Sequence, residues 1–309
     1  MEESGSATRK WEDLPSDILV EIFQKVDFPE LNSQIDHVFS AWHLACRDPL
    51  FWKTLDLSAL ESIFITIPHA PYVYVHSQSD KAVTQLLKIV LNLRRESIEI
   101  LIFHFNLYLS DEQLTYTAER CPLVKRVVMP AWNRIKETGI CKAIKKWRHL
   151  ESMTMPSIKN PPYLLEEISR NCENFSKLKI MGPFDMHFAL PLVTYIPRLK
   201  VLSLRCSVIM RDALVTILDN LQDLEVLNIS HCILIEDPPP PLPQRVVKEM
   251  IKEIDPFIMN KANRLREFLV CMDDSCVMCE RARSDEGLMR WYQYEEGLWK
   301  SDEVRSLAL

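Results

Sequence analysis

From residue 98 onward, apolar residues recur in this chain in a fixed local pattern. Two variable positions follow the first apolar residue and one follows the second, as in Ile98, Leu101 and Phe103. Because successive strand side chains point to opposite faces, the last two apolar residues of each unit share one face of a short strand. The units with this pattern are Ile98/Leu101/Phe103, Val124/Val127/Met129, Leu150/Met153/Met155, Phe175/Leu178/Ile180, Leu199/Leu202/Leu204, Leu224/Leu227/Ile229 and Leu265/Phe268/Val270.

Amphipathic helices are predicted between these strands, because apolar residues there recur at helical spacing. Ser110 and Gln113 form a capping box before the first helix. A single strand–helix unit cannot bury its apolar side alone, so we expect the units to stack into a parallel sheet with the helices outside. The predicted helices span residues 112–119, 140–147, 163–171, 191–195 and 213–220.

The spacing of the units resembles that of leucine-rich repeats. Their first apolar residues are separated by 26, 26, 25, 24, 25 and 41 positions. Five of these six intervals fall within the roughly 20–29-residue period of that class. Cys232 occupies a position where the repeat allows Asn or Cys, and the other units depart from this feature. The resemblance implies an α/β horseshoe with parallel concave strands and outer helices.

A separate apolar pattern marks the N-terminal segment from Trp11 to Leu57. Here Ile18 and Ile22 form one stripe of a predicted helix, and Leu19, Phe23 and Val26 form a second stripe beside it. One stripe is enough for packing against a small core. A segment of about fifty residues cannot bury both stripes by itself, so the surplus face needs a partner, either the rest of the chain or another protein.

This segment resembles an F-box, the three-helix module that docks F-box proteins onto the Skp-type adaptor of a cullin ubiquitin ligase. The similarity rests on Leu14-Pro15, Asp17-Ile18-Leu19, Glu21-Ile22-Phe23, Phe28-Pro29-Glu30-Leu31, Val38, Trp42 and Phe51-Trp52, in that order. The segment departs from the family pattern at Phe39-Ser40 and Asn32-Ser33-Gln34. The alternative is that these helices only cap the repeats. The adaptor contacts implied by the resemblance are Leu14, Pro15, Ile18, Leu19, Ile22, Phe23, Leu31, Val38, Trp42 and Trp52.

These patterns divide the chain into five parts. We expect a disordered tail at 1–9, the F-box at 10–57, a connecting or first irregular repeat at 58–97, the repeats at 98–270 and a C-terminal cap at 271–309. Residues 55–57 and 63–67 read as strands. A proline-rich insertion at 236–245 lengthens the last interval. It is either a stiff surface loop or, through Pro240, Pro243 and Arg245, a ligand of SH3 type.

Composition excludes several classes of function. The chain has 309 residues, a net charge of −6 and only five scattered glycines. These features predict no nucleic-acid binding and no glycine-rich phosphate loop. No apolar run is long enough to span a membrane, and the polar N-terminus is unlike a secretion signal. Nine dispersed cysteines are typical of reduced thiols, so we expect a protein of the nucleus or cytoplasm.

The sharpest candidate for chemistry is Cys271, Cys276 and Cys279. Three thiolates suit zinc only with a fourth ligand, and the nearest candidates, Cys232 and His231, are distant in sequence. The sequence therefore favours three packed thiols, with no metal and no cofactor. A zinc- or thiol-dependent enzyme stays open as an alternative, but no catalytic constellation is found and a non-catalytic protein is predicted.

The resemblance implies a function in ubiquitin transfer. The chain would be the substrate receptor of a Skp–cullin–F-box (SCF) ubiquitin ligase, reaching the cullin and RING subunits through the adaptor, and the repeats would bind a protein target. The alternative is a repeat scaffold without a ubiquitin-ligase role. A hormone and inositol-phosphate site, as in some longer plant relatives, is less favoured.

Residues that point outward from the strands are the predicted target contacts, although many of them can equally be plain solvated positions. The loop at 182–188 is a second candidate. The outward residues are Lys179, Met181, Ser203, Arg205, Asn228 and Ser230, together with Ile102, His104, Val201 and Val226.

Overall fold

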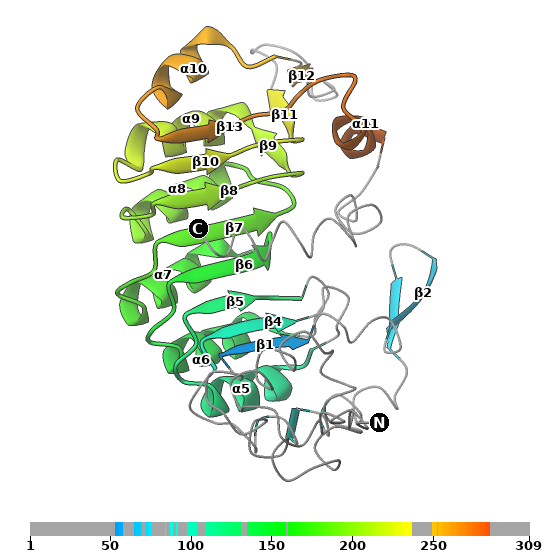
Figure 1. The fold of residues 1–309 in the computed structure, drawn as a ribbon, viewed down its shortest axis with the longest axis vertical. Coiled ribbons are helices and arrows are strands. Elements are labelled where there is room, and N and C mark those ends of the chain that lie inside the picture. Colours follow the sequence, from blue (N-terminus) through cyan, green and yellow to red (C-terminus); the bar gives the residue numbers. More distant parts are fainter. Residues whose placement is uncertain are drawn as a thin grey trace, which may run out of the picture.

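A parallel sheet of eight strands forms the framework of the protein (Figure 1). The computed structural model describes residues 53–57, 65–69, 72–75, 98–103, 109–130, 135–158, 160–236, 249–251 and 253–284, together with residues 84, 87, 88 and 91. The strand order is β1-β4-β5-β6-β7-β8-β10-β13, which follows the chain. Each strand therefore adds to the edge left by its predecessor, as stacking of repeats requires.

All seven predicted repeat strands are confirmed as members of this sheet. An eighth strand, β1, pairs in parallel with β4 at its start, so the last residues of the predicted F-box segment belong to the repeat sheet. Residues 54–57 therefore confirm the strand expected near residue 55. The strands are β1 (Thr54–Leu57), β4 (Ile100–Phe103), β5 (Arg126–Val128), β6 (Ser152–Pro156), β7 (Lys177–Met181), β8 (Val201–Ser203), β10 (Val226–Asn228) and β13 (Glu267–Leu269).

The strand register aligns the central apolar residue of each repeat into one continuous row. These residues face the outer helices and are buried from Leu55 to Leu227, all with exposed fractions of 2% or less. Burial of a continuous apolar row is the main force that holds the repeats together. The row consists of Leu55, Leu101, Val127, Met153, Leu178, Leu202, Leu227 and Phe268.

Helices cover one face of the sheet, as expected (Figure 1). Each presents apolar residues at helical spacing to the strands, as Leu114 and Ala118 do in α5 and Leu214 and Leu218 do in α9. Successive helices pack side by side along the stack. The helices are α5 (Asp111–Arg120), α6 (Glu137–Lys146), α7 (Pro161–Asn171), α8 (Met186–Tyr195), α9 (Arg211–Asn220) and α10 (Pro256–Ala262), followed at the C-terminal end by α11 (Val277–Ser284).

Local sequence signals explain where two of these helices begin. The capping box before α5 is confirmed: Gln113 N donates to Ser110 Oγ at 3.3 Å, and Ser110 N donates to Gln113 Oε1 at 2.9 Å. The predicted start of α8 at Pro191 is wrong. The helix begins at Met186 because Asp185 caps it, with the carboxylate accepting from Phe188 N at 3.1 Å.

Two smaller sheets accompany the main one. Near the C-terminal end, β9 (Val208–Met210) and β11 (Ile233–Glu236) pair in parallel, and β12 (Glu249–Ile251) pairs antiparallel to β11. This sheet was not predicted, because short strands that follow a turn carry little periodicity of their own. A hairpin of β2 (Ile65–His69) and β3 (Tyr72–Val75) lies before the repeats, and β2 overlaps the strand expected at 63–67. The proline-rich insertion lies outside the described residues.

The turns after β7, β8 and β10 share one backbone feature, a residue with positive φ. Gly182, Cys206 and His231 each lie seven positions after the first apolar residue of their repeat, and all three have positive φ, of 118°, 58° and 59°. In two of these three turns the side chain of the next residue bonds back to the preceding repeat: Ser207 Oγ donates to Ile180 O at 3.2 Å and Cys232 Sγ to Leu204 O at 2.8 Å. Ser207 is therefore the equivalent of Cys232 that the sequence reasoning missed.

Candidate functional site

The predicted adaptor contacts lie outside the described residues. These are Leu14, Pro15, Ile18, Leu19, Ile22, Phe23, Leu31, Val38, Trp42 and Trp52. Their assignment stays a prediction at the level of structure. In the described chain the sheet begins at β1, where Leu55 and Leu57 are buried in the repeat core.

The inner face of the sheet, which points away from the helices, carries the predicted target contacts. Lys179, Ser203 and Asn228 are in register on neighbouring strands β7, β8 and β10. We call the row that contains them the inner row. It consists of Asp56, Ile102, Val128, Thr154, Lys179, Ser203, Asn228 and Leu269. The sequence reasoning thus grouped these three residues on one face correctly, while their role in binding stays a prediction.

Exposure varies along the inner row. Ile102, Val128 and Thr154 are buried. Lys179, a predicted target contact, is only 6% exposed, which argues against the alternative that it is a plain solvated strand residue. Ser203 and Asn228 are half-buried, and Leu269 at the end of the row is 42% exposed. Asp56, at the other end of the row, is also exposed, so the described row is buried in its middle and accessible toward both ends.

The other predicted contacts belong to the turns after the strands. Arg205 and Ser230 are half-buried, and the Ser230 carbonyl accepts from Cys206 N at 3.0 Å, which links the two turns. Asn228 Oδ1 accepts from Ser230 N at 2.9 Å, so this side chain also stabilises its own turn. Met181 ends β7, and the other outward candidates Val201 and Val226 are half-buried and buried respectively. His104 lies outside the described residues.

The candidate target loop at 182–188 is partly buried. Phe184 and Phe188 are 0% and 1% exposed, with ring centroids 5.5 Å apart. Residues 186–188 form the first turn of α8. Pro183, Asp185 and His187 of the same segment are exposed, so its role as a second target contact stays a prediction.

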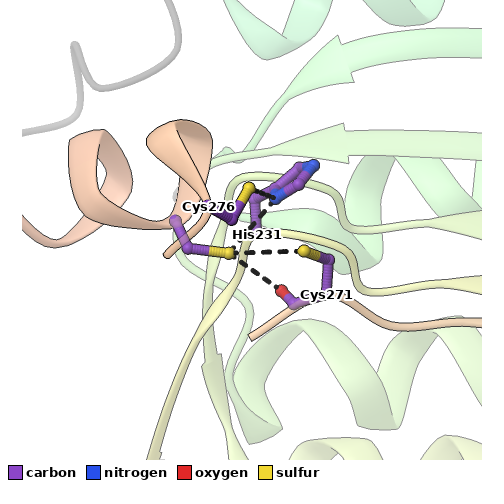
Figure 2. Close-up of side chains that lie close together, drawn as sticks. His231, Cys271 and Cys276 are labelled. Atoms are coloured by element: carbon purple, nitrogen blue, oxygen red, sulfur yellow. Dashed lines mark hydrogen bonds between the residues drawn. The ribbon is translucent and has the colours of Figure 1, made fainter. Parts of the chain in front are cut away.

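A cluster of donor atoms lies at the C-terminal end of the stack. His231 follows β10, Cys271 follows β13, Cys276 precedes α11 and Cys279 is inside α11 (Figure 2). We call these four residues the C-terminal cluster. Their sulfur and ring-nitrogen atoms all lie within 4.8 Å of one another. The sequence reasoning expected no metal here because it found no clear fourth ligand; that reason is wrong, since the fold brings His231 to the three cysteines.

The individual distances in the C-terminal cluster are short. His231 Nδ1 lies 3.2 Å from Cys279 Sγ and 3.6 Å from Cys276 Sγ, and the sulfurs of Cys271 and Cys279 are 3.6 Å apart. Figure 2 shows the side chains pointing toward a common centre. Cys279 is 3% exposed and the other three residues are half-buried.

The thiols of the cluster have different acidities. Backbone N–H groups of Cys279 and Met278 donate to the Cys276 sulfur and lower its pKa. Burial, together with the neighbouring thiols Cys271 and Cys276, raises the pKa of Cys279 to about 12. Without a cation, three sulfurs this close therefore do not all ionise, because their negative charges repel.

Cysteines elsewhere in the described chain behave as ordinary core residues. Burial raises the pKa of Cys121 and Cys172 to about 12, and both lie at the C-terminal caps of repeat helices. The Cys172 thiol donates to Trp147 O at 3.4 Å. Buried thiols of this kind are unreactive, unlike the thiols of the C-terminal cluster, which lie beside one another and an imidazole.

None of the helices in the described ranges has the length and apolar character of a membrane span.

The repeating strand, turn and outer helix define the described chain as a leucine-rich-repeat protein. The F-box-like family model matches residues 11–58, a range whose last residues form strand β1 of the sheet. F-box/LRR-repeat protein At3g48880 of Arabidopsis thaliana is 59% identical over 302 residues, covering 97% of each chain. F-box protein SKIP1 of the same plant is 26% identical over 181 residues, covering 58% of this chain and 57% of its own. The chain belongs to the plant F-box/LRR-repeat proteins.

Proposed function

We propose that this protein is the substrate-recognition subunit of an SCF-type ubiquitin ligase. The observation that supports this most directly is the order of its parts: an F-box-like segment at residues 11–58 runs straight into a continuous repeat sheet. The F-box binds the Skp-type adaptor and, through it, the cullin and RING subunits. The repeat sheet binds a protein target, which is ubiquitinated and then degraded.

The chain acts by position rather than by making bonds. Holding a target and a charged ubiquitin-conjugating enzyme in one complex raises the effective concentration of the target lysine near the thioester. A stack of strands in sequence order suits this task, because the strands and outer helices form one continuous packed core. The target is then held on a surface of defined orientation.

The target surface is the accessible part of the inner face. Its half-buried members Ser203 and Asn228 lie beside the turns that carry Arg205 and Ser230, and the exposed Leu269 adds an apolar position. Lys177 and Arg126 lie two strands apart on the same face, flanking Ser152. Burial and the positive charge of Arg126 lower the pKa of Lys177. A partner that brings carboxylates to this part of the sheet would relieve that repulsion.

The cell compartment proposed for this activity is the nucleus or cytoplasm. All eight cysteines that lie within the described residues are free thiols, which is the usual state in those compartments.

Capture of targets tests the proposal. The full chain and a truncated chain starting at residue 53 are expressed in plant cells with the proteasome inhibited. Both should capture the same target, because both keep the repeat sheet, but only the full chain should bring adaptor with it and increase target ubiquitination. Target capture without any adaptor-dependent ubiquitination would support the repeat scaffold instead.

A further inference from the structure

The donor atoms of the C-terminal cluster have the composition of a structural zinc site. Three sulfurs and one imidazole nitrogen make a Cys3His set, which binds zinc with tetrahedral geometry. With zinc–sulfur bonds of about 2.3 Å and a zinc–nitrogen bond of about 2.0–2.1 Å, the donor atoms of an ideal site are about 3.6–3.8 Å apart. The observed separations of 3.2–3.6 Å, within an outer limit of 4.8 Å, are close to these values.

Backbone contacts, and not only contacts between the donor side chains, hold the donor residues in place. His231 has a φ of 59°, a left-handed conformation that turns its side chain toward the segment after β13, and His231 N donates to Cys271 O at 2.8 Å. Residues other than glycine rarely adopt this conformation unless their surroundings impose it. The imidazole and the first sulfur are therefore brought together by a backbone bond between two repeats.

The other two sulfurs are positioned by a turn and a helix. Asp273 Oδ1 accepts from both Ser275 N and Ser275 Oγ at 2.8 Å, and Cys276 N donates to Asp273 O at 3.2 Å. Cys276 and Cys279 are three residues apart at the start of α11, so they lie on the same side of that helix.

Packing of single thiols does not account for the whole arrangement. Core cysteines such as Cys232 donate to a backbone carbonyl of the preceding repeat, and Cys279 Sγ likewise donates to Cys271 O at 3.2 Å. Cys279 Sγ differs in that two further cluster atoms, Cys271 Sγ and His231 Nδ1, lie within 3.6 Å of it. A disulfide between Cys271 and Cys279 would use two sulfurs and leave Cys276 and the imidazole turned toward it without a role. A cation at the centre engages all four donors at once.

We propose that the C-terminal cluster binds one Zn²⁺ ion through His231 Nδ1 and the three cysteine sulfurs. Three Zn–S bonds and one Zn–N bond form, the protons of the thiols are released to solvent, and no electrons are transferred. Four protein ligands leave no open position, so the ion is structural and not catalytic. This inference does not depend on the ubiquitin-ligase role.

The zinc would close the C-terminal end of the repeat stack. The cluster links the turn after β10 to the segment after β13 and to α11, and β13 is the last strand of the sheet in the described chain. A terminal repeat has a neighbour on one side only and needs an additional contact to hold its edge. A metal crosslink between segments about 40 residues apart supplies such a contact.

Metal content and spectroscopy on the full chain test the proposal. The protein is produced without a polyhistidine tag, in zinc-supplemented medium and with reductant. Elemental analysis should find one zinc per chain, and a chelator should lower the thermal midpoint by about 5 °C or more. Cobalt(II) added to the reduced apo protein should give the absorption of tetrahedral thiolate coordination, a readout that does not depend on any variant folding.

Matched variants assign the ligands. His231→Asn removes the imidazole but keeps a residue that tolerates the left-handed turn, and Cys276→Ser removes one sulfur; each should abolish stoichiometric zinc. Cys141→Ser, in the buried face of α6 and outside the cluster, should keep one zinc per chain. The proposal is overturned if the wild-type chain neither retains zinc nor binds cobalt, if it holds iron or a disulfide there instead, or if the two ligand variants keep full zinc.

Discussion

Replacing Thr154 by valine should stabilise the protein, against the usual direction of a core substitution. Thr154 is 0% exposed on the inner row between Val128 and Lys179. Its hydroxyl oxygen has no hydrogen-bond partner among the described residues. A buried hydroxyl without a partner costs about 1–3 kcal/mol in proteins. Valine has nearly the same shape and removes that cost.

The expected gain is about 1–2 kcal/mol. The gain should stay below the upper limit of about 3 kcal/mol for an unpaired hydroxyl. The methyl group that replaces the hydroxyl must fit the same packed space, and this offsets part of the gain. Valine favours a strand at least as much as threonine, so the backbone adds no penalty. In a chain of 309 residues, each kcal/mol moves the thermal midpoint by about 1.5–2 °C.

The matched control is Thr117→Val. Thr117 is also 0% exposed, but its Oγ1 donates to Gln113 O at 2.8 Å inside α5. Losing this bond should destabilise the protein by about 0.5–1.5 kcal/mol. Both variants are compared with the wild type by urea unfolding and by thermal midpoint. If Thr154→Val is neutral or destabilising while Thr117→Val behaves as expected, the inference that the Thr154 hydroxyl is unpaired is refuted.

Three further substitutions test the packing of the repeats, each by urea unfolding at pH 7 unless stated. Leu202→Ala, fully buried in the core row, should cost about 2–5 kcal/mol, and a loss below 1 kcal/mol would contradict its place there. Arg264→Ala should cost about 1–2 kcal/mol, because the Arg264 guanidinium donates to the carbonyls of Leu218 and Leu221 at 2.8 Å at the end of α9. Arg264→Lys should recover part of this stability. Equal losses in the two variants would argue against the multiple hydrogen bonds of the guanidinium. Burial disfavours the Asp255 carboxylate, but the Ile258 N–H and Arg211 outweigh this and lower its pKa. The stability from this group is therefore present above its unfolded pKa of about 3.9 and is lost as pH falls through the lower folded value. Asp255→Asn, which keeps the cap, should thus cost more at pH 7 than at pH 3, and a pH-independent cost would contradict the Arg211 pairing.

The repeat fold was predictable because its signal is local and recurs. Each strand needs only an apolar triplet such as Leu199, Leu202 and Leu204, and each helix an apolar face between two strands. The capping box of Ser110 was readable for the same reason. The start of α8 was missed because Pro191 suggested a first turn, whereas Asp185 supplies the cap.

The functional groupings depend on distances that local sequence does not encode. His231 and Cys271 are 40 positions apart and meet only because β10 and β13 are neighbours across the insertion. The sequence did carry one signal for His231. Gly182, Cys206 and His231 each occupy the same position of their repeat, so His231 could have been placed in the turn after its strand. The low exposure of Lys179 could not be read from strand alternation, because alternation gives the face of a residue and not what covers that face.

Titration of the Skp-type adaptor into the purified chain tests whether the N-terminal segment docks this protein onto a ubiquitin ligase. The full chain is compared by calorimetry with a chain that starts at residue 53, which removes the F-box-like segment but keeps Leu55 and Leu57 in the core. The full chain should bind the adaptor one-to-one, and the shorter chain should not bind it while its circular dichroism still shows the folded repeats. No binding by the full chain, or equal binding by both, would contradict it.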